Sequence, residues 1–488
     1  MRSHKSLCVA VLCIMSLCLP VGGCVKNPVT GGRQLALISE SQEIAMGEAS
    51  HPEVLAQFGM VQDNALQQYF SGIGANLAKV SHRPELPWHF TIVDSPVVNA
   101  FAVPGGYIYL TRGMIEHMNN EAEMASVVGH EIGHVTARHS VTQLSKQQLF
   151  GLGLGVGSIL SPTFSQFSQL AEAGLGLLLL KFSREDERQA DELGIEYMTK
   201  TGYDPDQMSK FFQLMLSMEE ESGKAIPSWL SSHPTTPERI QATSESAARV
   251  KQGSAVRDFK INANEFLPRL EGLVYGENPR EGFVENGKFY HPDLRFQLDI
   301  PNGWKTQNTQ SVVIFSEPSG GAVIQLSMAS SQLGQTPETV GQNIGRMEGT
   351  QLLAGQTDRI NGNQAFLGQY SVQSDSGTIG VLAAFISYGG HIYQLAGLAP
   401  NATFSRYASS INPVLRSFRE LKDQRLLGRQ PDRIRMYRAR RGETLRGLVN
   451  STGQGLVKVE DLVLINRIDP DKPLEAGTLV KLVQPGRR

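Results

Sequence analysis

Apolar residues recur at helical spacing through most of the first half of the chain. Residues 41–58 and 64–80 are expected to form helices, and the second run places Leu66, Phe70 and Ile73 on one side. Apolar runs at residues 88–93 and 107–110 are typical of strands, and helical patterns then continue to about residue 250. The pattern predicts a mainly helical first domain that contains a small sheet.

The pattern becomes strand-like after a glycine-rich, polar stretch at residues 272–287. The spacing of Phe296, Ile300-Pro301 and Gly303-Trp304 resembles the opening of PsbP/DcrB-like α+β domains. We therefore expect a multidomain α+β protein in which residues 285–420 form an α+β domain of unknown role and 421–435 form a basic linker. The expected strands are 294–300, 312–315, 322–328, 364–372, 380–387 and 391–396.

The last block of the chain resembles a LysM module, a small βααβ unit that binds peptidoglycan. Its marks are Tyr437, Gly442-Glu443-Thr444-Leu445, Ile465-Asn466 and Gly477-Thr478. The resemblance implies a module over residues 436–485 and peptidoglycan as a partner. The alternative is a βααβ cap without affinity for glycan.

The beginning of the chain has the pattern of a secretory signal. Basic residues precede an apolar run at residues 7–19, and Gly22-Gly23 stand directly before Cys24. This arrangement resembles the lipobox of bacterial lipoproteins, in which cleavage leaves the cysteine as a lipid-bearing N-terminus. We expect a signal peptide at 1–23, lipidation of Cys24 and a tether at 24–40. A plain signal peptide with an incidental cysteine is the alternative.

The remaining cysteines and the overall composition narrow the picture further. Cys8, Cys13 and Cys18 leave with the signal, so the exported chain has no second thiol for a disulfide. By the lipoprotein resemblance, Val25 after the cysteine favours the periplasmic face of the outer membrane. The formal net charge of −2 gives no argument for nucleic acid as a partner. No apolar run reaches the roughly 18–20 residues of a membrane-spanning helix, so the membrane is expected as a partner through the lipid anchor only.

Residues 119–140 are expected to form one helix, and it contains His130-Glu131-Ile132-Gly133-His134. Since a helix turns about 100° per residue, His134 lies about 40° around the axis from His130 and one turn along. Both imidazoles therefore face one side and can share one Zn²⁺. Glu131 lies at the flank of that face, where its carboxylate can reach a metal-bound water. This HExxH arrangement supplies two zinc ligands and a general base.

Zinc needs a further protein ligand, and the sequence offers two candidates. His139 comes too early for the class that uses a later histidine, and on a continuing helix it points away from His130. We interpret it as a surface or second-layer residue. The acidic stretch 183–191 offers the other candidate, because its Glu187 and Asp191 share a helix face at i,i+4 spacing. One of them can bind the metal while the other orients a histidine ring.

Four motifs in order resemble the HtpX/BepA/CAAX-prenyl-protease family of gluzincin zinc metallopeptidases, over roughly residues 28–250. The motifs are NAFAVPGGYIYLTRGM from Asn99, HEIGHVTARH, SREDERQAD and His233-Pro234. The resemblance implies His130, His134 and Glu187 as zinc ligands, Glu131 as base and Asp191 as the partner of His130, with Glu185 disfavoured as a ligand. Integral members of this family have transmembrane helices. In this chain the apolar segments 150–160 and 170–182 are too short to span a bilayer, and they are expected to be buried or to cover the site.

Substrate contacts can also be assigned. His233 is expected either to stabilise the oxyanion or to act as an inhibitory fourth zinc ligand, with Arg239 supporting either role. Asn99, Ala100 and Phe101 are expected to form an edge strand that pairs with an extended substrate through backbone hydrogen bonds.

The first domain, residues 41–272, is therefore expected to be a zinc-dependent endopeptidase of the bacterial cell envelope, acting in quality control or processing. Its substrates are expected to be unfolded or misassembled envelope proteins. Two alternatives stay open: an assembly chaperone with latent protease activity, and a peptidoglycan-binding protein with a structural zinc site.

Overall fold

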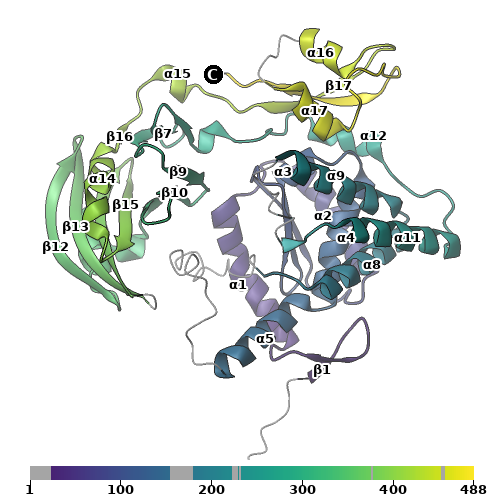
Figure 1. Ribbon diagram of the computed structural model, residues 1–488, viewed down its shortest axis with the longest axis horizontal. Helices are drawn as coiled ribbons and strands as arrows, with labels where there is room; N and C mark the ends of the chain where they lie inside the picture. Colours follow the sequence, from purple (N-terminus) through teal and green to yellow (C-terminus); the bar gives the residue numbers. More distant parts are fainter. Residues whose placement is uncertain are drawn as a thin grey trace, which may run out of the picture.

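The computed structural model describes residues 24–153, 180–222, 229, 232–374, 377–451 and 457–487 (Figure 1). The expected signal peptide at 1–23 and most of the two apolar segments between 150 and 182 lie outside these residues. The described part consists of a mainly helical N-terminal domain, a β-rich domain and a small C-terminal module. The coarse prediction of a multidomain α+β protein is confirmed. Among the described residues, no helix is long and apolar enough to cross a membrane.

The N-terminal domain begins with a short hairpin rather than with an extended tether. Strands β1 (Cys24–Lys26) and β2 (Arg33–Leu35) pair antiparallel, and the Gln34 side chain donates to the carbonyl of Ala137 at 3.0 Å. Helices α1 (Glu40–Phe58) and α2 (Asn64–Lys79) follow where apolar periodicity predicts them. Their N-termini are capped by the side chains of Ser39 and Asp63, which explains where each helix begins.

A three-stranded sheet follows, with β3 (His89–Val93), β4 (Ala100–Val103) and β5 (Tyr107–Thr111) in the order β3-β5-β4. Strand β4 pairs antiparallel with β5 and lies at one edge of the sheet. The remaining helices of the domain are α3 (Arg112–Glu116), α4 (Glu121–Thr136), α5 (His139–Gly153), α8 (Arg184–Lys200), α9 (Asp206–Ser222), α11 (Pro237–Gly253) and α12 (Ala263–Phe266).

Helix α4 runs through the centre of this domain, and every one of its residues is buried. It packs against α8 at very short range because both contact faces carry glycines. A Cβ on Gly129 would lie 3.2 Å from the Cα of Gly194, and one on Gly133 would lie 2.9 Å from the carbonyl oxygen of Ala190. Because these glycines have no side chains, α8 approaches α4 closely at Ala190 and Gly194, about one and two turns after Glu187.

The expectation of one continuous helix over residues 119–140 is wrong. Helix α4 ends at Thr136, and α5 begins at His139. Between them Arg138 adopts a left-handed backbone conformation with φ of 59°, which a continuing helix does not allow. The guanidinium of Arg138 is fixed by Glu43 at 3.1 Å and by the Ile38 carbonyl at 2.8 Å, so long-range contacts stabilise the break.

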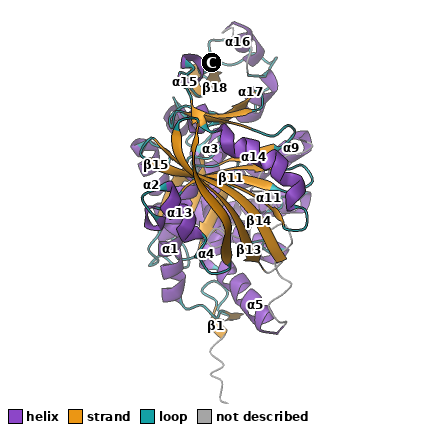
Figure 2. Cartoon of the chain, turned by 90° about the vertical axis from the view of Figure 1, so that its left-hand side faces the viewer, coloured by secondary structure: helices purple, strands orange, loops and turns teal. Residues whose placement is uncertain are grey.

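The β-rich domain is built on a seven-stranded antiparallel sheet, which faces the viewer in Figure 2. Helices α13 (Pro337–Ile344) and α14 (Phe404–Ser417) pack on it. The strands are β6 (Phe283–Glu285), β7 (Lys288–His291), β8 (Phe296–Asp299), β9 (Lys305–Asn308), β10 (Val312–Ser316), β11 (Val323–Met328), β12 (Thr350–Ile360), β13 (Asn363–Ser374), β14 (Gly377–Tyr388), β15 (His391–Pro400) and β16 (Arg419–Glu420). All six predicted strands are present, but five strands of this domain were not predicted: β6, β7, β9, β12 and β16. The longest of them, β12, was missed because most of its residues are exposed and show no apolar alternation.

The C-terminal module follows the order β17 (Arg433–Arg438), α16 (Leu445–Ser451), α17 (Val459–Asn466) and β18 (Leu479–Gln484), with β17 and β18 antiparallel. It has a core of its own around Leu445, Leu462 and Val480. The basic segment before it contains the short helix α15 (Gln424–Leu427). Both views show the module lying against the N-terminal domain.

Candidate metal centre

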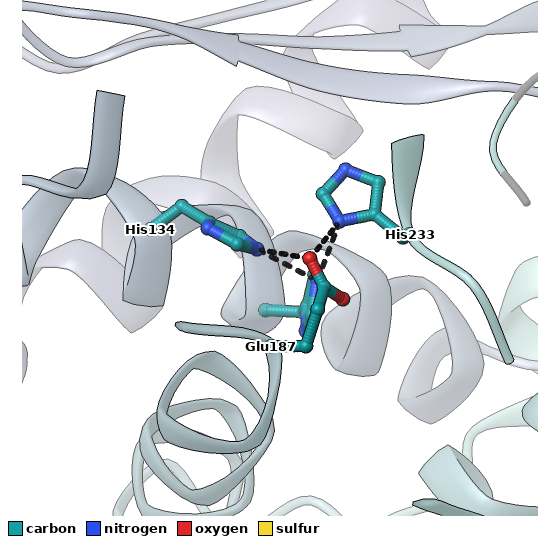
Figure 3. A group of neighbouring side chains, drawn as sticks. His134, Glu187 and His233 are labelled. Carbon is teal, nitrogen blue, oxygen red and sulfur yellow. Dashed lines mark hydrogen bonds and ion pairs between the residues drawn. The ribbon is translucent and has the colours of Figure 1, made fainter. Parts of the chain in front are cut away.

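Three separate elements bring four metal-binding side chains together. Helix α4 supplies His130 and His134, α8 supplies Glu187, and the segment before α11 supplies His233. All four are buried, and one ligand atom from each lies within 4.8 Å of the others. Figure 3 shows the Glu187 carboxylate pointing between the rings of His134 and His233. The convergence expected from the sequence is therefore present in the fold.

The distances between these atoms fit a tetrahedral zinc site. Ligand atoms about 2.0–2.1 Å from a tetrahedral zinc lie roughly 3.3 Å apart. The two Nε2 atoms of His130 and His134 lie 3.0 Å apart, and His130 Nε2 lies 3.2 Å from His233 Nδ1. Oε1 of Glu187 lies 3.4 Å from His134 Nε2 and 2.8 Å from His233 Nδ1. A single cation between them would lie within reach of all four atoms.

The protonation states of His134 and Glu187 also suit a metal. Burial lowers the pKa of His134 well below its usual value, so its ring is neutral and has a free lone pair. Burial alone would raise the pKa of Glu187, but the neighbouring His233 and His134 outweigh it and hold that pKa well below its usual value. A neutral imidazole and an ionised carboxylate are the forms that bind zinc.

Glu131 is the one member of the motif that does not join this cluster of ligand atoms. It is 1% exposed, its Oε1 has no hydrogen-bond partner among the described residues, and that atom lies 3.7 Å from His233 Nε2. A buried carboxylate oxygen without a partner is costly, and such atoms in folded proteins call for an explanation. Its position beside the ligand cluster fits a group that receives a proton during a reaction.

A second layer of residues orients the ligands from behind. His130 Nδ1 lies 2.8 Å from Asp191 Oδ1, which leaves Nε2 facing the cluster. Arg239 donates to both oxygens of Asp191 at 2.8 and 2.9 Å, and its Nη1 forms an ion pair of 2.8 Å with Glu187 Oε2. Arg239 thus fixes Glu187, a candidate ligand, together with Asp191, the partner of the candidate ligand His130. From the sequence alone, Arg239 is expected only to support His233.

His139 lies in this second layer and not at the surface. The break at Arg138 turns it back towards His134, and it is only 4% exposed. Its Nε2 lies 2.9 Å from Oε1 of Gln189, and its Nδ1 lies 3.0 Å from Nδ1 of His134. A hydrogen bond at Nδ1 of His134 turns the opposite ring nitrogen, Nε2, towards the cluster. The prediction that His139 points away from His130 failed because it assumed an unbroken helix.

The segment expected to pair with substrate lies at an edge of the three-stranded sheet. Ala100 and Phe101 belong to β4 at the edge of the sheet, and Asn99 directly precedes it. Strand β4 contacts α4. The side-chain Oδ1 of Asn99 is buried without a hydrogen-bond partner among the described residues. The backbone N–H of Trp229, whose ring stacks on His233, donates to the Val98 carbonyl at 3.2 Å. The segment before the edge strand is thereby connected to the metal ligands.

Comparison with known proteins places this domain in context. Residues 64–247 match the model described as Peptidase family M48. The chain is 31% identical over 233 residues to the beta-barrel assembly-enhancing protease of Yersinia pestis, and this alignment covers 46% of this chain and 48% of the relative. It is 29% identical over 224 residues to the mitochondrial metalloendopeptidase OMA1 of Schizosaccharomyces pombe, with 45% of this chain and 65% of that protein covered.

The family match lies in the N-terminal domain. The chain spans about half the length of the curated bacterial relatives it matches. Among solved structures, the cyanobacterial PsbP of Synechocystis aligns at 15% identity with a TM-score of 0.24, covering 28% of this chain and 96% of that one. The description of the β-rich domain rests on its own sheet order.

Proposed function

Residues 64–247 form a domain of peptidase family M48, a family of metallopeptidases, and from this premise we propose that the protein is a zinc-dependent endopeptidase. The observation that carries the proposal is the convergence of His130, His134 and Glu187 beside Glu131, a buried carboxylate whose Oε1 has no hydrogen-bond partner among the described residues. Relatives named as metalloendopeptidases support it.

In the proposed site, His130, His134 and Glu187 hold the metal, and His233 is the fourth donor in this conformation. A bound zinc ion would supply Lewis acidity at the scissile carbonyl and make the attacking water more acidic. Asp191 and His139 orient the two histidine rings from behind, and Arg239 fixes the Glu187 carboxylate.

Glu131 acts as the general base in this proposal. It accepts a proton from the attacking water and then gives this proton to the nitrogen of the leaving amine. His233 has two possible tasks, since Nδ1 faces the ligand atoms while Nε2 faces Glu131. With its Nδ1 in the cluster it closes the fourth ligand position, and after moving aside it can donate to the developing oxyanion.

The substrate proposed for this site is an extended polypeptide. Backbone groups at Asn99, Ala100 and Phe101, along the edge strand, would pair with it and read little of its side-chain identity. Unfolded or misassembled proteins of the cell envelope fit this mode of binding, because their backbone is free to pair. We propose quality control or processing of such proteins as the role of the enzyme.

We propose that the protein acts at the periplasmic face of the outer membrane, on the basis of Cys24 and of the LysM-like module. Lipidation of Cys24 would attach the protein to the periplasmic face of the outer membrane, and the LysM-like module would bind peptidoglycan. The hairpin β1–β2, which contains Cys24, packs against the start of α5, so the anchor would lie close to the catalytic helix.

Two other functions have some support. The name of the bacterial relative, beta-barrel assembly-enhancing protease, favours a role in assembly. The presence of four donors favours a purely structural zinc site, which has four protein ligands. A structural site, however, gives no reason to bury Oε1 of Glu131 beside the cluster without a hydrogen bond from the described residues, and we therefore favour catalysis.

The substitution Glu131→Gln tests the proposal in the full-length protein. Because glutamine keeps the shape but cannot accept the proton, peptide hydrolysis is expected to fall by about 10²–10⁴-fold while one equivalent of zinc is retained. Cleavage of unfolded casein and metal analysis of the same preparation are the two measurements. Unchanged hydrolysis would refute the assigned base. A cellular phenotype that survives the substitution would favour the assembly role.

A further inference from the structure

The C-terminal module reaches into the N-terminal domain with a buried lysine. Lys481 lies on β18, is 0% exposed, and donates from Nζ to the carbonyl oxygens of Glu116 and Met118 at 2.7 and 2.9 Å. These carbonyls belong to the end of α3 and to the turn that leads into α4. Fully buried lysines are rare unless their donors are satisfied, so this contact is a specific one.

A second cation of the module contacts α4 itself. Arg467, at the C-terminal cap of α17, pairs through Nη2 with Glu123 in the first turn of α4. Glu123 is 2% exposed and also accepts from the backbone N–H of Asn119 at 2.9 Å and from the side chain of Asn120 at 2.7 Å. Since Asn120 is the N-cap of α4, Arg467 takes part in the network that starts this helix.

The backbone of the module is joined to the same domain. Strand β17 exchanges hydrogen bonds with residues 272–275, from Ile434 N–H to the Leu273 carbonyl at 2.7 Å and from Gly272 N–H to the Ile434 carbonyl at 2.8 Å. The Ile434 side chain is 1% exposed and belongs to the main hydrophobic core of the N-terminal domain. The module is thus attached by main chain, by apolar packing and by two cations.

We propose that the C-terminal module positions the catalytic helix, with Lys481 and Arg467 as its positioning residues. Two of the candidate metal ligands, His130 and His134, lie on the same helix as Glu123, about two and three turns further along. When the module holds the α3–α4 turn and the first turn of α4, it fixes where His130 and His134 are presented. The module therefore has a task inside the enzyme, whatever it binds outside.

The substitution Lys481→Met in the full-length protein tests this inference. Methionine keeps the length of the side chain but leaves the two carbonyls without their donor. Lys472→Met is the matched control, because Lys472 belongs to the same module and is exposed. We expect amide hydrogen exchange at residues 117–124 to become about tenfold faster or more in Lys481→Met, since a local opening equilibrium is raised, and to stay unchanged in Lys472→Met.

Two further readouts separate positioning from simple stability. If α4 shifts, zinc affinity measured by chelator competition is expected to fall, and kcat is expected to fall while KM changes little. Exchange and zinc affinity test the inference even if the chain hydrolyses no peptide, so its failure is distinguishable from failure of the proposed function. Faster exchange confined to residues 433–484, with unchanged zinc affinity, would overturn the inference.

If Lys481→Met does not fold, Arg467→Gln and Glu123→Gln provide the same test in milder form. Each removes one half of the Arg467–Glu123 pair, and a double-mutant cycle measures their coupling. We expect the two effects on zinc affinity to be non-additive, because the second substitution finds the pair already broken. Additive effects, or none, would overturn the inference.

Discussion

The two ends of helix α4 are both buried, but they satisfy their polar groups in opposite ways. At the N-terminal end, Glu123 accepts from Asn119, Asn120 and Arg467, and Lys481 donates to two carbonyls. At the other end, two imidazoles and a carboxylate crowd together, and Oε1 of Glu131 has no hydrogen-bond partner among the described residues.

This difference separates stability from chemistry within a single helix. At the N-terminal end the Glu123 oxygens and Nζ of Lys481 are hydrogen-bonded, although Nε of Arg467 has no partner among the described residues. A buried polar network of this kind rigidifies the structure around it. In a buried cluster whose metal-binding lone pairs face one another, and in which a carboxylate oxygen lacks a hydrogen bond, the polar atoms are unfavourable until a cation or a substrate occupies the space between them. The N-terminal end is therefore the fixed support of the helix, and the C-terminal end is the part that is completed by a metal and a substrate.

The largest effect is expected at the metal end. The substitution His134→Ala removes one ring of the pair, so zinc content is expected to fall from one equivalent towards zero. Peptide hydrolysis is expected to fall by about 10³-fold or more, since the metal contributes several kcal/mol to the transition state. Metal analysis after dialysis checks the first outcome, and full zinc retention would mean that the ligand set is wrong.

The residues behind the ligands are expected to have a smaller effect at the same end. Asp191→Asn and His139→Gln each weaken the orientation of one ring, and zinc affinity is expected to fall by about 10–100-fold in either variant. His391→Gln, on an exposed position of the β-rich domain, is the control. Equal zinc affinity in His139→Gln and the control would remove His139 from the site.

At the supporting end, an effect on stability is expected in addition to the effect on zinc affinity. The pair of substitutions Arg467→Gln and Arg446→Gln compares two arginines of one module, each paired with a carboxylate. Losing the Arg467 contact to buried Glu123 is expected to cost about 2 kcal/mol. Losing the exposed Arg446–Asp471 pair is expected to cost at most about 1 kcal/mol. Urea unfolding of the metal-free protein checks the order, and a reversed order would contradict the comparison.

The smallest expected effect concerns acid sensitivity at the supporting end. Burial lowers the pKa of His117 to about 4, with the charges of Lys481 and Arg467 acting in the same direction. Between pH 6.5 and 4 the unfolded chain binds a proton that the folded chain does not, so stability from this residue is lost as pH falls. The loss is about 1.4 kcal/mol per pH unit in this window.

The substitution His117→Gln isolates that contribution. Between pH 7.5 and 5.5 the wild-type protein is expected to lose about 1.4 kcal/mol more stability than the variant, because the window covers one unit below 6.5. Urea unfolding at both pH values measures the difference. Identical losses in the two proteins would show that His117 is not held in its neutral form by the fold.

The sequence predicted the metal end better than the supporting end, for a physical reason. His130, Glu131 and His134 are set by local helix geometry, and the Glu187–Asp191 spacing follows from one helix turn. The break at Arg138 could not be foreseen, because distant Glu43 and Ile38 hold the left-handed residue. The docking of Lys481 depends on contacts between residues far apart in the chain, and hydrophobic periodicity carries no information about them.

The central claim is that one cation is held between α4 and α8. Anomalous diffraction from crystals of the zinc-loaded full-length protein, recorded at the zinc absorption edge, tests it directly. We predict one strong peak at bonding distance from His130 Nε2, His134 Nε2 and a Glu187 oxygen. A zinc peak elsewhere, or a peak that Glu187 does not reach, would contradict the claim.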